Sequence, residues 1–131
     1  MSYTRSILDS GIIRTMVHGR MDLQRSLASL TELSSMTKDR KLYEVVIHEP
    51  GSSLDVGFNE ASRLVALAQK IFSGLEEGAI AFVADDDMIF ALCRQLQMQI
   101  SNEKVQLTVF RNESTALQWL RELMNSKSNI K

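Results

Sequence analysis

The sequence predicts one α/β domain, built on a mostly parallel sheet of about five strands that opens with an antiparallel hairpin. Two short segments rich in β-branched and apolar residues flank Gly11 near the amino terminus. Beyond them, short apolar segments alternate with longer segments in which apolar residues recur at helical spacing. The resulting order is ββαβαβαβα, and strands separated by a helix pair in parallel through right-handed crossovers. We therefore expect a mixed sheet packed with helices.

The first half of the chain contains the hairpin, one helix and the central strand. Residues 3–8 and 12–17 form the hairpin strands, because Gly11 can take the positive φ that a tight turn needs. Asp22 can cap the first helix, whose apolar stripe consists of Leu23, Leu27, Leu30 and Leu33. Residues 42–48 lack clean alternation, which is typical of a central strand covered on both faces.

The second half contains three more helices and two more strands. Pro50 ends the central strand, and an irregular connection leads to Asn59, the expected cap of the second helix. Residues 79–84 and 105–110 are the remaining strands, and the helices after them begin at three aspartates and at Asn112. We expect the domain to cover residues 1–125 and a polar tail to follow at residues 126–131.

Composition excludes several classes of protein. The 131 residues are 44% hydrophobic, which is enough for the core of one domain. With 15 Lys plus Arg against 16 Asp plus Glu, no overall field attracts nucleic acid or an acidic membrane. Cys93 is the only cysteine, which excludes an internal disulfide and fits a reducing compartment. The start lacks a signal-peptide pattern, and the apolar runs are too short for stable membrane insertion, so we expect a cytoplasmic protein.

The closing segment, residues 109–120, reads VFRNESTALQWL and ends in a helix with the pattern Ala-Leu-x-Trp-Leu. This segment and the order of elements resemble the SpoIIAA-like proteins of the STAS superfamily. The resemblance covers nearly the whole chain in topology and these twelve residues in sequence. It implies a non-enzymatic regulatory or ligand-binding module. Lipid-carrying SEC14-type domains have a related fold, but this chain is too short to add their pocket-forming helices.

The phosphorylation switch of better-known STAS domains is missing. There, a serine in an Asp-Ser-Ser/Thr-Gly motif starts the helix after the central strand. The corresponding stretch is Asn59-Glu60-Ala61-Ser62, which keeps a capping residue and lacks the motif. We expect a module without that switch, which binds a protein partner or a small apolar ligand.

Polar residues follow two predicted parallel strands, at the edge where open α/β sheets bind ligands. The expected ligand rim consists of His48, Glu49, Ser52, Ser53, Asp85, Asp86 and Asp87. The serines could bind an anion or be phosphorylated. The three aspartates could hold a hard cation, but helix capping and the helix dipole explain them better. We therefore predict no metal and no cofactor.

A small enzyme is the alternative, with His48, Glu49 and the aspartates 85–87 as acid and base groups. No nucleophile completes that set at a recognisable spacing. A degenerate receiver domain is a further alternative, but its last strand would end in lysine, whereas here Phe110 is followed by Arg111.

Apolar residues also fall on helix faces expected to be wet. Phe90 and Met98 lie off the apolar stripe of their helix, on the side of Arg94, and Trp119 lies beside the stripe of the last helix. Such residues are typical of an interface, so a homodimer is expected. Cys93 falls on the apolar side of its helix and is expected to be a core residue.

Overall fold

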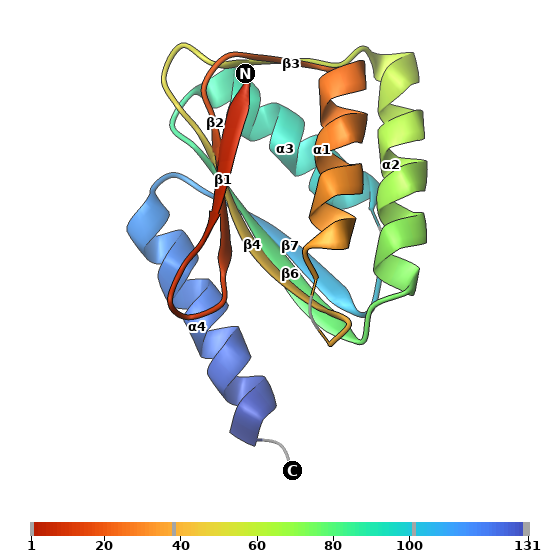
Figure 1. The fold of residues 1–131 in the computed structure, drawn as a ribbon. Helices are drawn as coiled ribbons and strands as arrows, with labels where there is room; N and C mark the ends of the chain where they lie inside the picture. The colour runs from red at the N-terminus through yellow and green to blue at the C-terminus, as the bar shows by residue number, and fades with distance from the viewer. Residues whose placement is uncertain (1, 38, 101, 130–131) are drawn as a thin grey trace.

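The computed structural model describes residues 2–37, 39–100 and 102–129 and contains a five-stranded sheet in the order β1-β2-β4-β6-β7 (Figure 1). The strands are β1 (Tyr3–Ile7), β2 (Ile13–Val17), β4 (Lys41–His48), β6 (Glu77–Ala84) and β7 (Val105–Phe110). β1 pairs with β2 antiparallel, and every other neighbouring pair in this sheet is parallel. The predicted mixed sheet with an amino-terminal hairpin is confirmed, and β4 is its central strand.

Four helices cover the two faces of the sheet unequally (Figure 1). The helices α1 (Leu23–Ser35), α2 (Phe58–Ser73) and α3 (Asp87–Gln99) lie on one face, and α4 (Glu113–Asn129) lies on the other. Asp22 caps α1 by accepting a hydrogen bond from the Arg25 amide at 2.9 Å, and Asn112 caps α4 by accepting from the Thr115 amide at 3.0 Å. Both predicted caps are confirmed.

Two short strands lie in segments where none was expected. β3 (Arg20–Asp22) and β5 (Ser53–Asp55) pair in parallel as a separate two-stranded sheet. Arg20 and Asp55 form an ion pair across it at 2.5 Å. The connection predicted to be irregular therefore contains a short strand. Its partner lies 33 residues earlier in the chain, with Arg20 opposite Ser53.

Two helix boundaries differ from the prediction. α2 begins at Phe58, so its cap is Gly57 and not Asn59; the Glu60 carboxylate accepts from the Gly57 amide at 2.9 Å. The Glu60 side chain thus supplies a hydrogen-bond acceptor to the amide at the start of the helix. This bond allows α2 to begin before Asn59. α4 continues to Asn129, so residues 126–129 of the expected tail are helical. Adding residues to an existing helix costs less free energy than starting a new one. Residues 130–131 lie outside the described residues.

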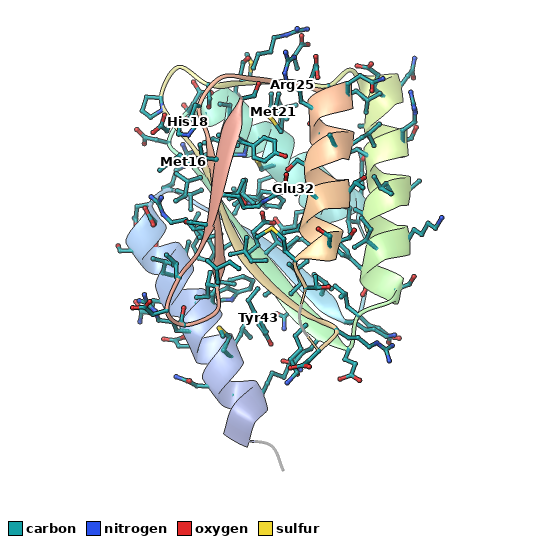
Figure 2. The ribbon with its side chains drawn as sticks, viewed as in Figure 1. Met16, His18, Met21, Arg25, Glu32 and Tyr43 are labelled. Carbon is teal, nitrogen blue, oxygen red and sulfur yellow. The ribbon has the colours of Figure 1, made fainter. Side chains whose placement is uncertain are left out.

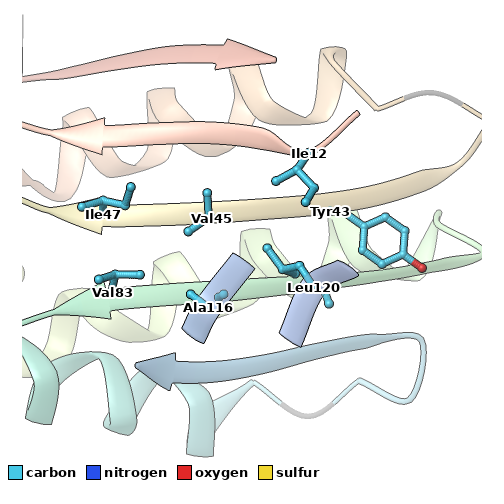
Figure 3. Close-up of a cluster of buried hydrophobic side chains, with 9 residues drawn as sticks. Ile12, Tyr43, Val45, Ile47, Val83, Ala116 and Leu120 are labelled. Atoms are coloured by element: carbon cyan, nitrogen blue, oxygen red, sulfur yellow. The ribbon is translucent and has the colours of Figure 1, made fainter. Parts of the chain in front are cut away.

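Successive residues of β4 face opposite sides and enter two separate cores. Tyr43, Val45 and Ile47 pack under α4, around Ala116 and Leu120 (Figure 3). The alternate residues of β4 face α1, α2 and α3, where the buried apolar side chains form the second core. That core includes Ile13, Leu33, Leu42, Phe72, Ile80 and Leu107. The two residues of β4 that interrupt its apolar pattern on this side are Glu44 and His48.

Candidate functional site

A cavity of about 120 Å³ lies between the sheet and the helices α1, α2 and α3. β2, β4, β6 and β7 form its floor, and the three helices form its roof. Its walls are mostly apolar and include Leu33, Val46, Phe72, Ile80, Phe82 and Leu107. Polar side chains reach it from the floor, in two groups centred on β4, and from the roof, where Ser26 and Ser29 of α1 line it.

The first polar group is a buried network around Arg5 and Glu44. Arg5 Nη2 lies 3.4 Å from Glu44 Oε2, and both side chains are almost completely buried. Thr15 bridges them, since its hydroxyl accepts from Arg5 Nε at 2.8 Å and donates to Glu44 Oε2 at 2.6 Å. The network therefore joins β1, β2 and β4 on the cavity side of the sheet.

The Arg5 guanidinium also connects the hairpin to α1 through hydrogen bonds. Arg5 Nη1 donates to the Ser29 carbonyl at 3.0 Å and to Glu32 Oε1 at 2.9 Å, and Nη2 donates to the Ser29 hydroxyl at 2.7 Å. Figure 2 shows Glu32 on the side of α1 that faces the hairpin. Together with Thr15 and Glu44, these acceptors take all five N–H donors of the arginine.

Glu44 has acceptor capacity left over. Both hydrogen bonds that it receives from the described residues go to Oε2, and none goes to Oε1. Burial raises the pKa of the Glu44 carboxyl, although the Arg5 charge and the Thr15 hydrogen bond act in the opposite direction. One carboxylate oxygen at the wall of an apolar cavity is thus left without a protein donor.

The second polar group is the pair His48 and Cys93. Nε2 of His48 lies 3.8 Å from the Cys93 sulfur, while Nδ1 is buried and has no hydrogen-bond partner among the described residues. Burial lowers the pKa of His48 to about 4 and raises the pKa of Cys93 to about 12. At neutral pH the contact therefore joins an uncharged imidazole to an uncharged thiol. The prediction that Cys93 is a core residue is confirmed, since it is 1% exposed.

The expected rim residues after β4 lie in two different environments. His48 points into the core, whereas Glu49 lies at the surface and accepts from His18 Nδ1 at 2.9 Å. Ser52 is buried, and its hydroxyl donates to the Glu49 carbonyl at 2.7 Å. This hydrogen bond closes the turn after β4. Ser53 is exposed in β5.

The aspartates after β6 serve α3. Asp86 is its cap and accepts from the amides of Met88 and Ile89 at 2.9 and 3.0 Å. Asp87 pairs with Arg111 at 2.8 Å, and the same guanidinium donates to the Asp85 carbonyl at 2.9 Å. The capping interpretation is confirmed for Asp86.

The two parts of the rim follow neighbouring strands, with His48 opposite Ala84, but their side chains make separate interactions. Within the described part of the chain, no hydrogen bond or ion pair joins His48 to any of the three aspartates. Nor do the described residues include a group of three or more His, Cys, Asp or Glu side chains placed to hold a metal ion.

The expected interface residues also differ in exposure. Phe90 is half-buried beneath the Arg111 guanidinium, which lies 4.0 Å from the ring centre. Trp119 packs against Phe110 with ring centres 5.5 Å apart. Arg94 is exposed, and Met98 is 78% exposed on α3.

A groove between α2 and α3 adjoins the cavity. It has a volume of about 150 Å³ and is lined by Val56, Ala61, Leu92 and two glutamines of α3, among others. Leu54, Leu64 and Leu96 line both the groove and the cavity. These three leucines therefore mark the place where the groove and the cavity meet.

Sequence reasoning missed Arg5, Thr15 and Glu44. One signal could have found them, because Glu44 is the only charged residue in the apolar run from residue 42 to residue 47. A carboxylate in a strand covered on both faces requires a buried partner. The identity of that partner follows only from the register Arg5↔Thr15 in the hairpin.

The fold and the site are those of an α/β protein with a mixed five-stranded sheet and a mostly apolar cavity beneath three helices. Comparison with protein-family models, with curated proteins and with solved structures found no match. No helix in the described ranges combines the length and apolar character needed to span a bilayer.

Proposed function

We propose that the protein is a non-enzymatic binding module that holds a small, mainly apolar ligand in the cavity beneath α1, α2 and α3. The main support is the cavity of about 120 Å³, whose lining is mostly apolar. Apolar cavities of roughly 150 Å³ in proteins stay dry and take up benzene or xenon. A ligand with the bulk of one aromatic ring therefore matches the space.

We assign the module to the STAS superfamily as part of this proposal. The assignment is supported by the order of the main elements, the mixed sheet and the closing helix that carries Trp119. A regulatory or ligand-sensing role follows from that assignment. The environments of the rim residues favour binding over catalysis, because His48 contacts Cys93 and Asp86 caps a helix.

A homodimer completes the proposal. Its support is α3, where Met88 and Met98 are 73% and 78% exposed. Large exposed apolar side chains on one element favour association with a second surface, although single ones are common.

Ligand uptake can be tested by filling the cavity. Ala68 is 2% exposed and lines the cavity, so Ala68→Leu should abolish benzene binding, because the added carbons occupy the space. Ala66→Leu is the matched control, since Ala66 is an exposed alanine of the same helix. Benzene and xenon binding would be followed by methyl NMR shifts, and native mass spectrometry of freshly purified protein would detect a retained ligand.

The proposal fails if the wild-type protein takes up neither benzene nor xenon. It fails equally if Ala68→Leu, folded by NMR, binds benzene as the wild type does.

A further inference from the structure

We infer that the ligand carries an O–H or N–H group, that Glu44 Oε1 accepts its hydrogen bond, and that the cavity selects small apolar alcohols, phenols or amines over ionised carboxylic acids. This inference rests on the proposed function, since it names the chemical class of the ligand.

Glu44 presents the free acceptor. Its side chain is 3% exposed, lines the cavity, and receives its hydrogen bonds from Thr15 and Arg5 on Oε2 alone. A carboxylate oxygen can accept about two hydrogen bonds. In an apolar cavity an unfilled acceptor costs free energy, and a donor on the ligand would remove that cost.

Arg5 cannot serve as a binding site for an anion. Each of its five N–H donors already has an acceptor, among them Glu32 and the carbonyl and hydroxyl of Ser29. An anionic ligand would have to displace one of these acceptors and would then lie beside the Glu44 carboxylate. The positive charge in the site is thus already paired within the protein. Among the charged side chains that line the cavity in the described part of the chain, Glu44 is the one with an unfilled hydrogen-bonding position, and the Ser26 hydroxyl of α1 also lines the space.

His48 is the other polar group on the floor, and it is a poorer anchor. Its Nδ1 has less than 1 Å² of accessible surface, so it is closed to the cavity. Glu44 and His48 lie four residues apart on β4, which separates their Cα atoms by about 13 Å. A molecule the size of one aromatic ring cannot reach both. Among the described residues, His48 Nδ1 is the only sealed side-chain nitrogen or oxygen without a partner, so Glu44 Oε1 retains surface that a ligand can touch.

The test compares benzene, phenol and benzoate at pH 7 by calorimetry and NMR titration of the full chain. One hydrogen bond to a buried carboxylate should make phenol bind about tenfold more tightly than benzene. Benzoate should bind more weakly than benzene. With ¹³C-labelled glutamate, the carboxyl resonance of Glu44 should shift on adding phenol and should stay in place on adding benzene.

Variants locate the anchor. Arg5→Met with Glu44→Met removes both members of the buried pair, so that no unpaired charge remains buried. Glu32, the other carboxylate that Arg5 contacts, has a half-exposed side chain and can be solvated. This double variant should keep benzene binding and lose the preference for phenol. His48→Leu removes the other polar group of the floor and should keep the preference. Ala66→Leu is the control outside the cavity.

The outcomes separate this inference from the proposed function. If benzene does not bind, the proposed function fails first. If benzene binds and phenol or benzoate binds no differently, the cavity is a ligand site and the inference is wrong. If the preference for phenol is lost in His48→Leu and kept in the double variant, Glu44 is not the anchor. The wild-type comparison alone decides the preference if a variant does not fold.

Discussion

Glu44 and His48 show how burial changes single ionisable groups on one face of β4. The pKa of Glu44 is raised and that of His48 is lowered to about 4, in each case chiefly because burial disfavours the charged form. Glu44 is compensated by Arg5 and Thr15, whereas the one polar contact of the His48 ring among the described residues is with the weakly polar thiol of Cys93. His48 is therefore the residue at which acidification should act on the fold.

Acid should destabilise the protein through His48. Its pKa falls from 6.5 to about 4 on folding, so between these values the unfolded chain binds the proton more tightly than the native protein does. The free energy of unfolding should therefore be unaffected by this group above pH 6.5 and should fall by roughly 3 kcal/mol between pH 6.5 and 4. Urea denaturation at a series of pH values measures it.

His48→Leu should remove that dependence on pH, and His18→Gln is a surface control that should keep it. Glu44 acts in the opposite direction, because its raised pKa makes the native state the better proton binder as pH rises above 4.5. Its contribution is common to all three proteins and cancels in the comparison. Equal slopes in wild type and His48→Leu would contradict the role of His48.

At the scale of elements, the strands β4 and β6 in the floor of the cavity approach each other closely at one glycine. The two strands pair over eight residues, with Leu42 opposite Gly78. A Cβ atom added at Gly78 would lie 2.4 Å from the Leu42 carbonyl oxygen. The glycine is therefore required by the spacing of the two strands, and its backbone has no positive φ that would explain it otherwise.

Gly78→Ala should destabilise the protein by about 1–3 kcal/mol, because the methyl group can be accommodated only if the paired backbones move apart. Gly19→Ala is the control, since the nearest atom to its added Cβ is 4.0 Å away. Chemical denaturation compares the two variants. A Gly78→Ala protein as stable as Gly19→Ala would show that the strands are not packed this closely.

The local sequence predicts some helix boundaries correctly and misses other boundaries and two short strands. Asp22 and Asn112 were found as caps because a capping carboxylate or amide acts within three residues. β3 and β5 were not expected, since each has three residues and exists only through pairing with the other. The start of α2 was misplaced because Gly57 has no side chain to signal a cap and the Glu60 carboxylate supplies the bond.

At the scale of the whole molecule, the two faces of the sheet are covered in different ways. One helix packs closely on the α4 face, around small residues such as Ala79, Ala81 and Ala116. Three helices share the other face, and the cavity lies beneath them.

Association through α3 should appear in sedimentation as a concentration-dependent shift from monomer to dimer. Met88→Gln with Met98→Gln should move the equilibrium toward monomer, because both methionines are exposed on that helix. Ile7→Thr is the control, since Ile7 is 55% exposed on β1. A wild-type mass that stays monomeric at high concentration would exclude the homodimer.

The α/β class, the hairpin, the central strand and the core position of Cys93 can all be predicted from the order of residues along the chain. These features depend on the period of apolar residues and on local capping, which act over a few neighbouring positions. Only the tertiary structure decided the cavity, the contact between His48 and Cys93, and the network in which Arg5 meets Glu44 across 39 residues. These features depend on which helices cover the same face of the sheet and on how completely their side chains fill the space above it. A local pattern of residues contains neither kind of information.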